Sequence, residues 1–291
     1  MALIDTFRRV GVSPADSRVS YDWTLHTPDA RHPFHKRRLF NPKESDFEDG
    51  APSEVGEPLV SCLMVTTGER FSIGCALECY RRQLYENREL VIVTYGDRLD
   101  AVQRLVEASG VANASVHAAG RDLALGEMRN MALGRARGEI LVQWDDDDLY
   151  DPLRISAAAT LLSRSSASAA LLRRMLIWWP DRELAAISAS RSWEGSIAVW
   201  RAFAPVYPAL DREEDIHAVG FLARTSPLLG FDASLLYVHV AHGGNTREAS
   251  HFERHLRDAT CVLRGSDYAE LIALLATRMP ILDYRAGGLS S

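Results

Sequence analysis

Short apolar runs alternate with amphipathic segments in the first half of this chain. Runs of strand-forming residues at 59–65, 90–95 and 114–118 predict three β-strands. Between them, residues 73–84 have helical spacing after Ser72, which can cap a helix, and residues 99–109 predict a second helix that stops at Gly110. Strands that alternate with helices predict an α/β fold with a mostly parallel central sheet flanked by helices.

The stretch at 126–152, GEMRNMALGRARGEILVQWDDDDLYDP, contains four consecutive aspartates. It predicts a helix, a turn at Gly138, a buried strand at 140–144 and a new helix, which Asp151 caps and Pro152 opens. The acids therefore follow a strand where it passes into a helix, the end at which α/β sheets bind ligands. In an extended chain, Asp145 and Asp147 would point to one side and Asp146 to the other.

The second half of the chain has a less regular pattern. A helix is expected at 153–163, and a strand at 169–179 that folds back through a turn at 180–181 against 184–188 as a hairpin. An apolar helix is expected after Ser196, a strand at 234–241, and helices at 248–264 and 268–278.

The acidic run itself indicates metal and phosphate chemistry. Two carboxylates on one side form a hard, oxygen-rich site that suits Mg²⁺ or Mn²⁺ carrying phosphates. The alternative is a solvated acidic turn. That alternative is weaker, because four adjacent carboxylates directly after a buried strand repel one another unless a cation or hydrogen-bond donors compensate.

Composition narrows the function classes. The chain has 291 residues, 47% of them hydrophobic and 25% charged, which is typical of a globular protein. A net charge of −6 argues against a nucleic-acid partner. The four cysteines lack a zinc-site pattern and are expected to be buried free thiols in a reducing cytoplasm. We expect no signal peptide and no transmembrane segment, and therefore a cytoplasmic location.

Charge patterning and periodicity divide the chain into three parts. Residues 1–57 are expected to form an N-terminal charged arm, basic at 31–38 and acidic at 44–57. A solvated extension is the favoured interpretation of the arm. Contact of its basic half with a partner or with anionic lipid at the inner face of the membrane is the alternative. Residues 58–250 would form the main domain, and residues 251–291 a C-terminal helical tail packed on it.

Several segments, in order, resemble inverting family 2 glycosyltransferases, which have the nucleotide-diphospho-sugar transferase fold called GT-A. PLVSCLMVTTGERFSIGCALECYRRQLYENRELVIVTYGD is similar to the first strand, helix and second strand of that family. GEMRNMALGRARGEILVQWDDDDLYDP is similar to the segment that leads into its metal-binding Asp-x-Asp. Glu214-Asp215 resembles the acidic pair that supplies the base, and HGGNT at 242–246 resembles its C-terminal histidine loop. The resemblance covers residues 58–250 and implies a GT-A glycosyltransferase domain there.

The resemblance implies a Mn²⁺ or Mg²⁺ cofactor. Asp145 and Asp147 would hold the ion, with Asp148 as a further ligand or sugar contact. His242 would be a ligand or a donor to the diphosphate, and the nearby His239 is the alternative to it. The metal would act as a Lewis acid on the diphosphate that leaves.

The resemblance also implies a nucleotide-diphosphate-sugar donor, with a UDP-sugar as the first expectation. The residues assigned to it are Thr66, Thr67, Tyr95, Asp97, Arg129, Asp145 and Asp146. The second strand of the family usually ends in Asp-Asp-Gly-Ser, whereas this chain has Thr94-Tyr95-Gly96-Asp97, so Tyr95 is expected to stack on the base and Asp97 to accept its hydrogen bond. Arg129 would either neutralise phosphate or form an ion pair with the aspartates.

The acceptor hydroxyl needs a general base, for which Asp215 is the candidate and Glu214 its neighbour. The alternative is that both acids only favour a helix N-terminus. Four tryptophans, which would either stack on sugars or pack in the core, are Trp178, Trp179, Trp193 and Trp200.

These observations predict a metal-dependent inverting glycosyltransferase that acts on a glycan, lipid-linked or small-molecule acceptor in glycan or polysaccharide biosynthesis. Two alternatives stay open: a sugar-phosphate nucleotidyltransferase, and a nucleotide-sugar-binding protein without catalysis. Against the first, the TTGERFS segment after the first strand is not a Gly-rich phosphate loop.

Overall fold

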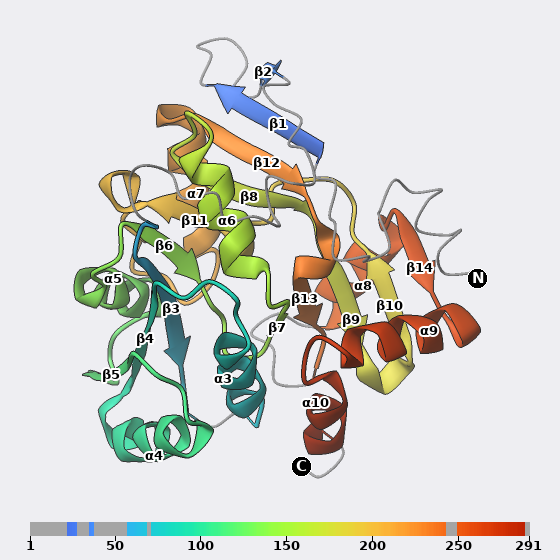
Figure 1. Cartoon of the computed structure of the whole chain (residues 1–291), viewed down its shortest axis with the longest axis horizontal. Coiled ribbons are helices and arrows are strands. Elements are labelled where there is room, and N and C mark those ends of the chain that lie inside the picture. The colour runs from blue at the N-terminus through green and yellow to red at the C-terminus, as the bar shows by residue number, and fades with distance from the viewer. Residues whose placement is uncertain (1–21, 28–34, 38–56, 69–70, 243–248, 289–291) are drawn as a thin grey trace.

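A computed structural model describes residues 22–27, 35–37, 57–68, 71–242 and 249–288. Its main framework is a nine-stranded sheet in the order β2-β1-β12-β8-β11-β6-β3-β4-β5 (Figure 1). The strands are β1 (Asp22–Thr27), β2 (His35–Arg37), β3 (Val60–Thr66), β4 (Arg88–Tyr95), β5 (Ala114–Ala119), β6 (Ile140–Gln143), β8 (Ala169–Arg174), β11 (Ala198–Trp200) and β12 (Leu228–Asp232). Strands β6, β3, β4 and β5 run parallel, as do β12 and β8, so the sheet is mixed but largely parallel.

Helices cover both faces of this sheet because successive strand residues point to opposite sides. On one face, Leu90 and Ile92 join a core with α3 (Ile73–Arg81), α4 (Leu99–Ser109) and α6 (Arg154–Ser163). On the other, Val91 and Val93 pack with α5 (Leu125–Arg135) and α7 (Glu214–Thr225). The predicted α/β class and flanked sheet are confirmed. The expected stop of the second helix at Gly110 is also confirmed, with a left-handed φ of 66°.

A second, five-stranded sheet lies beside the first in the order β14-β10-β9-β13-β7. Its strands are β7 (Leu149–Tyr150), β9 (Leu176–Trp179), β10 (Leu184–Ile187), β13 (Tyr237–Val240) and β14 (Cys261–Leu263). The expected hairpin is confirmed, because β9 and β10 pair antiparallel. In Figure 1 this sheet lies on the right, next to α8 (Ala249–Arg257), α9 (Gly265–Ala276) and α10 (Ile281–Gly288).

Part of the predicted charged arm contributes strands. Strand β1 pairs antiparallel with β12, and β2 pairs with β1, so residues from 1–57 extend one edge of the central sheet. Apart from Glu57, the rest of this segment lies outside the described residues, as does the loop at 243–246. None of the helices in the described part of the chain is long and apolar enough to cross a membrane.

Several predicted elements were wrong. The apolar residues after Ser196 form β11 rather than a helix, because they pair on both sides with β6 and β8, and a short buried strand has the same apolar pattern as a buried helix. The strand at 169–179 is two strands, β8 and β9, in different sheets. The expected strand at 234–241 begins as a turn of 3₁₀ helix, Ser234–Leu236, before β13.

Helix ends also differ from the prediction. The helix expected to open at Pro152 starts at Arg154. The helix at 73–84 ends at Arg81, and Leu84 is 63% exposed. The sequence pattern missed β12 and β14, which are short strands, and β14 interrupts the helix expected at 248–264.

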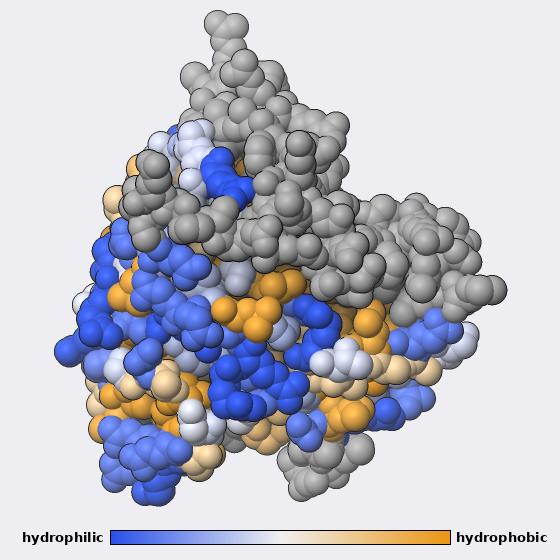
Figure 2. Space-filling model, in the orientation of Figure 1, coloured by the Kyte–Doolittle hydropathy of each residue, from blue (hydrophilic) through white to orange (hydrophobic). Residues whose placement is uncertain are grey.

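On the face shown in Figure 2, hydrophilic residues separate the apolar residues into small groups over the coloured area.

Candidate active site

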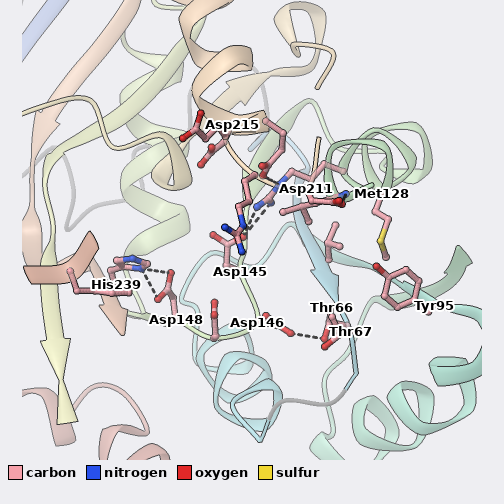
Figure 3. A pocket seen from close by; sticks show the side chains of 18 residues that line it. Thr66, Thr67, Tyr95, Met128, Asp145, Asp146, Asp148, Asp211, Asp215 and His239 are labelled. Carbon is pink, nitrogen blue, oxygen red and sulfur yellow. Dashed lines mark hydrogen bonds and ion pairs between the residues drawn. The ribbon is translucent and has the colours of Figure 1, made fainter. Parts of the chain in front are cut away.

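A pocket of about 330 Å³ lies where β3 and β4 end and where the chain leaves β6. Helix α5 and residues 211–215 form its other walls. Of the residues predicted for the site, all line this pocket except Asp97 and His242. In Figure 3, three aspartates that follow β6 are directed toward different walls of the pocket: Asp145, Asp146 and Asp148.

The aspartates do not alternate as an extended strand would, because β6 ends at Gln143. Asp145 points toward α5, Asp146 toward the end of β3, and Asp148 toward β13 (Figure 3). The expected alternation of Asp145, Asp146 and Asp147 assumed an extended chain, and that condition is not met in this segment. Each carboxylate has its own partners instead.

Arg129 joins the two acidic halves of the pocket. Its guanidinium lies 3.2 Å from Asp145 Oδ1 and donates to Glu214 Oε1 at 2.9 Å. Burial disfavours the charged form of Arg129, but Asp145 and Glu214 outweigh that effect and raise its pKa. The arginine is therefore a permanent cation between two carboxylates from distant parts of the chain.

Further donors fix Asp145. Gln143 Nε2 donates to both carboxylate oxygens at 3.0 and 3.2 Å, and the Tyr237 hydroxyl lies 3.3 Å from Oδ2. The Tyr150 hydroxyl accepts from the backbone N–H of Asp145 at 2.7 Å. This carboxylate is thus held in one orientation before any ligand arrives.

Asp146 and Thr66 hold the acidic segment against the end of β3. The Thr66 hydroxyl donates to Asp146 Oδ2 at 2.5 Å, and both side chains are buried. Thr67, the next residue, is exposed at the pocket wall. Of these neighbouring threonines, Thr67 is therefore the one with an accessible side chain for a ligand.

Asp148 is surrounded by donors. Its carboxylate accepts from the Tyr237 hydroxyl at 2.6 Å and from the Val240 N–H at 2.8 Å, and His239 Nδ1 lies at 3.0 Å. Burial lowers the pKa of His239, but Asp148 outweighs it and raises that pKa to about 9. The imidazole also stacks on Phe252, with ring centres 5.1 Å apart.

His242 contacts the cluster from outside the pocket. Its Nε2 lies 3.2 Å from Asp147 Oδ2, and the Tyr284 hydroxyl of α10 donates to the Asp147 carbonyl at 2.9 Å. Of the two histidines considered for this site, His239 lines the pocket and His242 supports Asp147.

At the opposite end, Tyr95 lines the pocket but Asp97 does not. Asp97 forms an ion pair with Arg121, whose hydrogen bond holds the pKa of this carboxyl below its usual range. The Arg121 guanidinium also lies over the Tyr95 ring, 5.7 Å from its centre. Asp97 is therefore outside the pocket lining and forms an ion pair with Arg121, which also contacts Tyr95.

The acidic pair opens helix α7. Glu213, with a left-handed φ of 66°, precedes it. Glu214 is 3% exposed, and burial raises its pKa although Arg129 opposes the shift. Asp215 also lines the pocket and accepts a hydrogen bond from the N–H of Ile216 at 2.8 Å. Both acids line the pocket, but they differ: Glu214 is buried and bound to Arg129, whereas Asp215 is partly exposed.

The donor set suits a divalent cation in its chemistry. Carboxylate oxygens are the ligands that Mg²⁺ and Mn²⁺ prefer, and such ions commonly take one or two carboxylates together with substrate phosphates. Within the described residues, no group of three or more acidic, histidine or cysteine side chains is arranged as a complete metal site. The pocket therefore offers carboxylate oxygens of the kind that such ions take, without a complete ligand set among the described residues.

Sequence reasoning missed part of the lining. The missed residues are Val65, Leu125, Met128, Asp211, Arg212, Glu213 and Phe252, together with Gln143 and Tyr237, which hold Asp145. Arg212 and Glu213 adjoin the predicted acidic pair, which is a usable signal, whereas Phe252 carries none. The four tryptophans considered for sugar stacking are outside the lining, and Trp178, Trp179 and Trp193 are buried.

Comparison with known proteins supports the fold and goes no further. No protein-family model matches the chain, and no curated protein matches it in sequence. The mannosyltransferase PcManGT from Pyrobaculum calidifontis, solved with GDP-Man and Mn²⁺, superposes with a TM-score of 0.53 at 19% identity, over 74% of this chain and 67% of that one.

S. aureus TarS 1–349 in complex with UDP-GlcNAc superposes with a TM-score of 0.52 at 17% identity, over 68% of this chain and 64% of that one. TarS 1–349 alone gives 0.51 at 15% identity, over 62% of this chain and 60% of that one. The match therefore spans less than two thirds of TarS 1–349. At such identities the likeness establishes the fold, and this chain has an α/β fold that matches GT-A glycosyltransferase structures.

Proposed function

We propose that this protein is a metal-dependent inverting glycosyltransferase that moves a sugar from a nucleotide-diphosphate sugar to an acceptor hydroxyl. The observation that carries the proposal is the composition of one pocket at the carboxyl end of a largely parallel sheet. It combines consecutive aspartates after β6, a buried arginine and a second acidic pair from α7. In this proposal, a cation site and a base site share one cavity.

The charge of the pocket supports a metal ion. A nucleoside diphosphate is an anion, and the carboxylates around it would repel it unless a cation lay between them. Arg129 is already paired with two carboxylates and supplies little net charge to a ligand. A divalent ion carried with the donor solves this conflict, as the preference of Mg²⁺ for carboxylates plus substrate phosphates suggests.

We assign the ion to Asp147, with Asp145 beside it. When bound, it would neutralise charge on the departing nucleoside diphosphate. His242 orients Asp147 through its hydrogen bond, in the way that outer residues orient metal ligands. Asp148 already accepts from several donors, so its proposed role is to hold His239 at the pocket wall.

The donor would lie with its nucleotide toward Tyr95, Met128 and Thr67, and its sugar toward Asp215. Tyr95 offers a ring for the base, and its neighbour Asp97 is engaged by Arg121. We assign the general base to Asp215, which would take the proton of the acceptor hydroxyl during a single displacement. Glu214 would hold Arg129 in place.

The test is the variant Asp215→Asn, which keeps the shape of the side chain and removes the proton acceptor. The donor is first identified by measuring the melting temperature with UDP-GlcNAc or GDP-mannose, with and without Mn²⁺. A ligand that binds the native state raises this temperature. Turnover of the variant should fall by about 10²–10⁴-fold, with nucleotide affinity unchanged. Glu107→Gln, the same chemical change at an exposed position of α4 outside the pocket lining, is the control and should retain activity.

Two results would overturn the proposal. If nucleotide affinity were equal in EDTA and in Mn²⁺, the proposed metal dependence would be rejected. A product that keeps the anomeric configuration of the donor, read by NMR, would exclude a single displacement.

A further inference from the structure

Residues 205–213, here called the strap, cross the start of helix α5 and lead directly into the acidic pair. Asn130 of α5 binds the strap through both ends of its amide. Its Nδ2 donates to the carbonyl of Tyr207 at 2.8 Å, and its Oδ1 accepts from the N–H of the same residue at 2.9 Å. A two-point contact with one backbone unit fixes both the position and the direction of the strap.

The strap also lies in direct contact with the backbone of α5. A Cβ added to Gly126 would stand 1.8 Å from the carbonyl oxygen of Pro208, so only glycine permits this approach. The N–H of Gly126 donates to the carbonyl of Leu210 at 3.0 Å, and the N–H of Leu125 donates to Asp211 Oδ1 at 3.2 Å. The strap therefore satisfies two of the N–H groups that the start of α5 leaves without a partner inside the helix.

The strap is tied to the site at its far end as well. Arg129, one position before Asn130, binds Glu214. The buried Tyr207 ring lies 5.9 Å from the Arg129 guanidinium carbon. Successive residues of one helix thus set the strap, the acidic pair and, through Arg129, the aspartate at the end of β6.

We propose that Asn130 and Gly126 are positioning residues that place Asp215 for catalysis. This inference rests on the proposed function, in which Asp215 is the base. Neither residue has to touch the substrate. They act by holding the strap, because a displacement of about 1 Å in a reacting group can cost about 10²-fold in rate.

The first experiment measures the strap itself. Hydrogen exchange is compared by mass spectrometry between the full-length protein and its Asn130→Ala variant. Peptides from 205–213 should exchange faster in the variant, while peptides from β3 and β4 keep their protection. Unchanged exchange in the strap would overturn the inference, whatever the activity.

The second experiment measures nucleotide release from UDP-GlcNAc and GDP-mannose with Mn²⁺, together with the affinity for UDP and GDP. Asn130→Ala should lower kcat by about 10–100-fold at nearly unchanged nucleotide affinity. A merely structural role would instead lower nucleotide affinity and melting temperature together with kcat. Gly126→Ala should behave like Asn130→Ala. The matched control is Gly134→Ala on the same helix, where an added Cβ meets nothing within 4 Å, and it should keep full activity.

A double variant separates this inference from the proposed function. If Asn130 acts by placing Asp215, adding Asn130→Ala to Asp215→Asn should lower the rate little further, because residues that act as a unit are not additive. Fully additive losses would overturn the inference. Full activity of Asp215→Asn would reject the assigned base itself, whereas an inactive Asp215→Asn beside a fully active Asn130→Ala would reject only the role of the strap.

Discussion

Arg129 is the buried cation on which two acidic segments converge, so Arg129→Gln should destabilise the fold. The variant leaves Glu214, whose side chain is 4% exposed, and Asp145, whose side chain is 23% exposed, without their cation. Removing one partner of a buried ion pair costs about 3–5 kcal/mol. Asp145 keeps its bonds to Gln143 and Tyr237, so we expect the lower end of that range, about 3 kcal/mol.

The loss of folding stability in Arg129→Gln should depend on pH. Burial and Asp215 raise the pKa of Glu214, and the cation that opposes them is Arg129. Without it, the folded pKa rises further above the unfolded value, so the folded state binds more protons than the unfolded state between the two values. The stability that protonated Glu214 gives the variant is therefore fully present below the pKa of Glu214 in the unfolded state. It is lost as the pH rises through the pKa of Glu214 in the folded state. The variant should be closer to the wild type at about pH 5 than at about pH 8.

Urea unfolding at both pH values measures this effect. A loss of about 3 kcal/mol with an m-value of about 2–3 kcal/mol/M moves the midpoint by about 1 M. Arg135→Gln, at an exposed position of the same helix, is the control and should change stability by less than about 0.5 kcal/mol. Adding Glu214→Gln to Arg129→Gln should restore part of the loss. A change below about 1 kcal/mol at both pH values would refute the role of Arg129 as the buried counter-ion.

Three further predictions follow from the other parts of the site. Asp147→Ala should abolish the Mn²⁺-dependent part of nucleotide binding while the melting temperature stays near that of the wild type, and calorimetry with and without EDTA decides it. Tyr95→Ala should weaken nucleotide binding more than Asp97→Asn, because Asp97 lies outside the pocket and pairs with Arg121, and equal losses by titration would contradict this ordering. Burial, His251 and Arg191 lower the pKa of His255 to about 4, so the folded state resists its protonation and loses stability as pH falls below the unfolded value of about 6.5. His255→Gln should reduce this loss of stability at acidic pH, which melting temperatures recorded between about pH 4 and pH 6.5 would measure.

Much of the first half of the fold was determined by local sequence. Strands β3 and β4 and helix α4 lie where period and capping predicted them, because each is a regular apolar pattern bounded by a turn signal. The hydrophobic pattern did not predict the correct element where the chain is fully buried, because buried strands and buried helices are both apolar throughout. β11 is apolar because strands lie on both sides of it. The run through β8 and β9 passes from one sheet to the other at Arg173 and Arg174, which interrupt the apolar residues without a turn signal.

The site divides in the same way. The acidic run after β6 and the acids that open α7 could be found by inspection, since carboxylates after a buried strand and at a helix start are local features. Of their partners, only Arg129 was anticipated, as an ion pair with the aspartates. Arg129 meets Glu214 across 85 positions, and Asp148 meets His239 across 91, because the two sheets and α5 bring those segments together.

Tertiary structure also decided which candidate faces the ligand. The sequence favoured His242 over His239 for the site, but of the two it is His239 that lines the pocket, where its ring contacts Asp148 and Phe252. Asp97 follows the expected strand, yet it is outside the pocket lining and pairs with Arg121. Residue types and local spacing thus determined the available chemistry. Long-range packing decided the direction of each side chain, because that direction depends on partners that no local pattern contains.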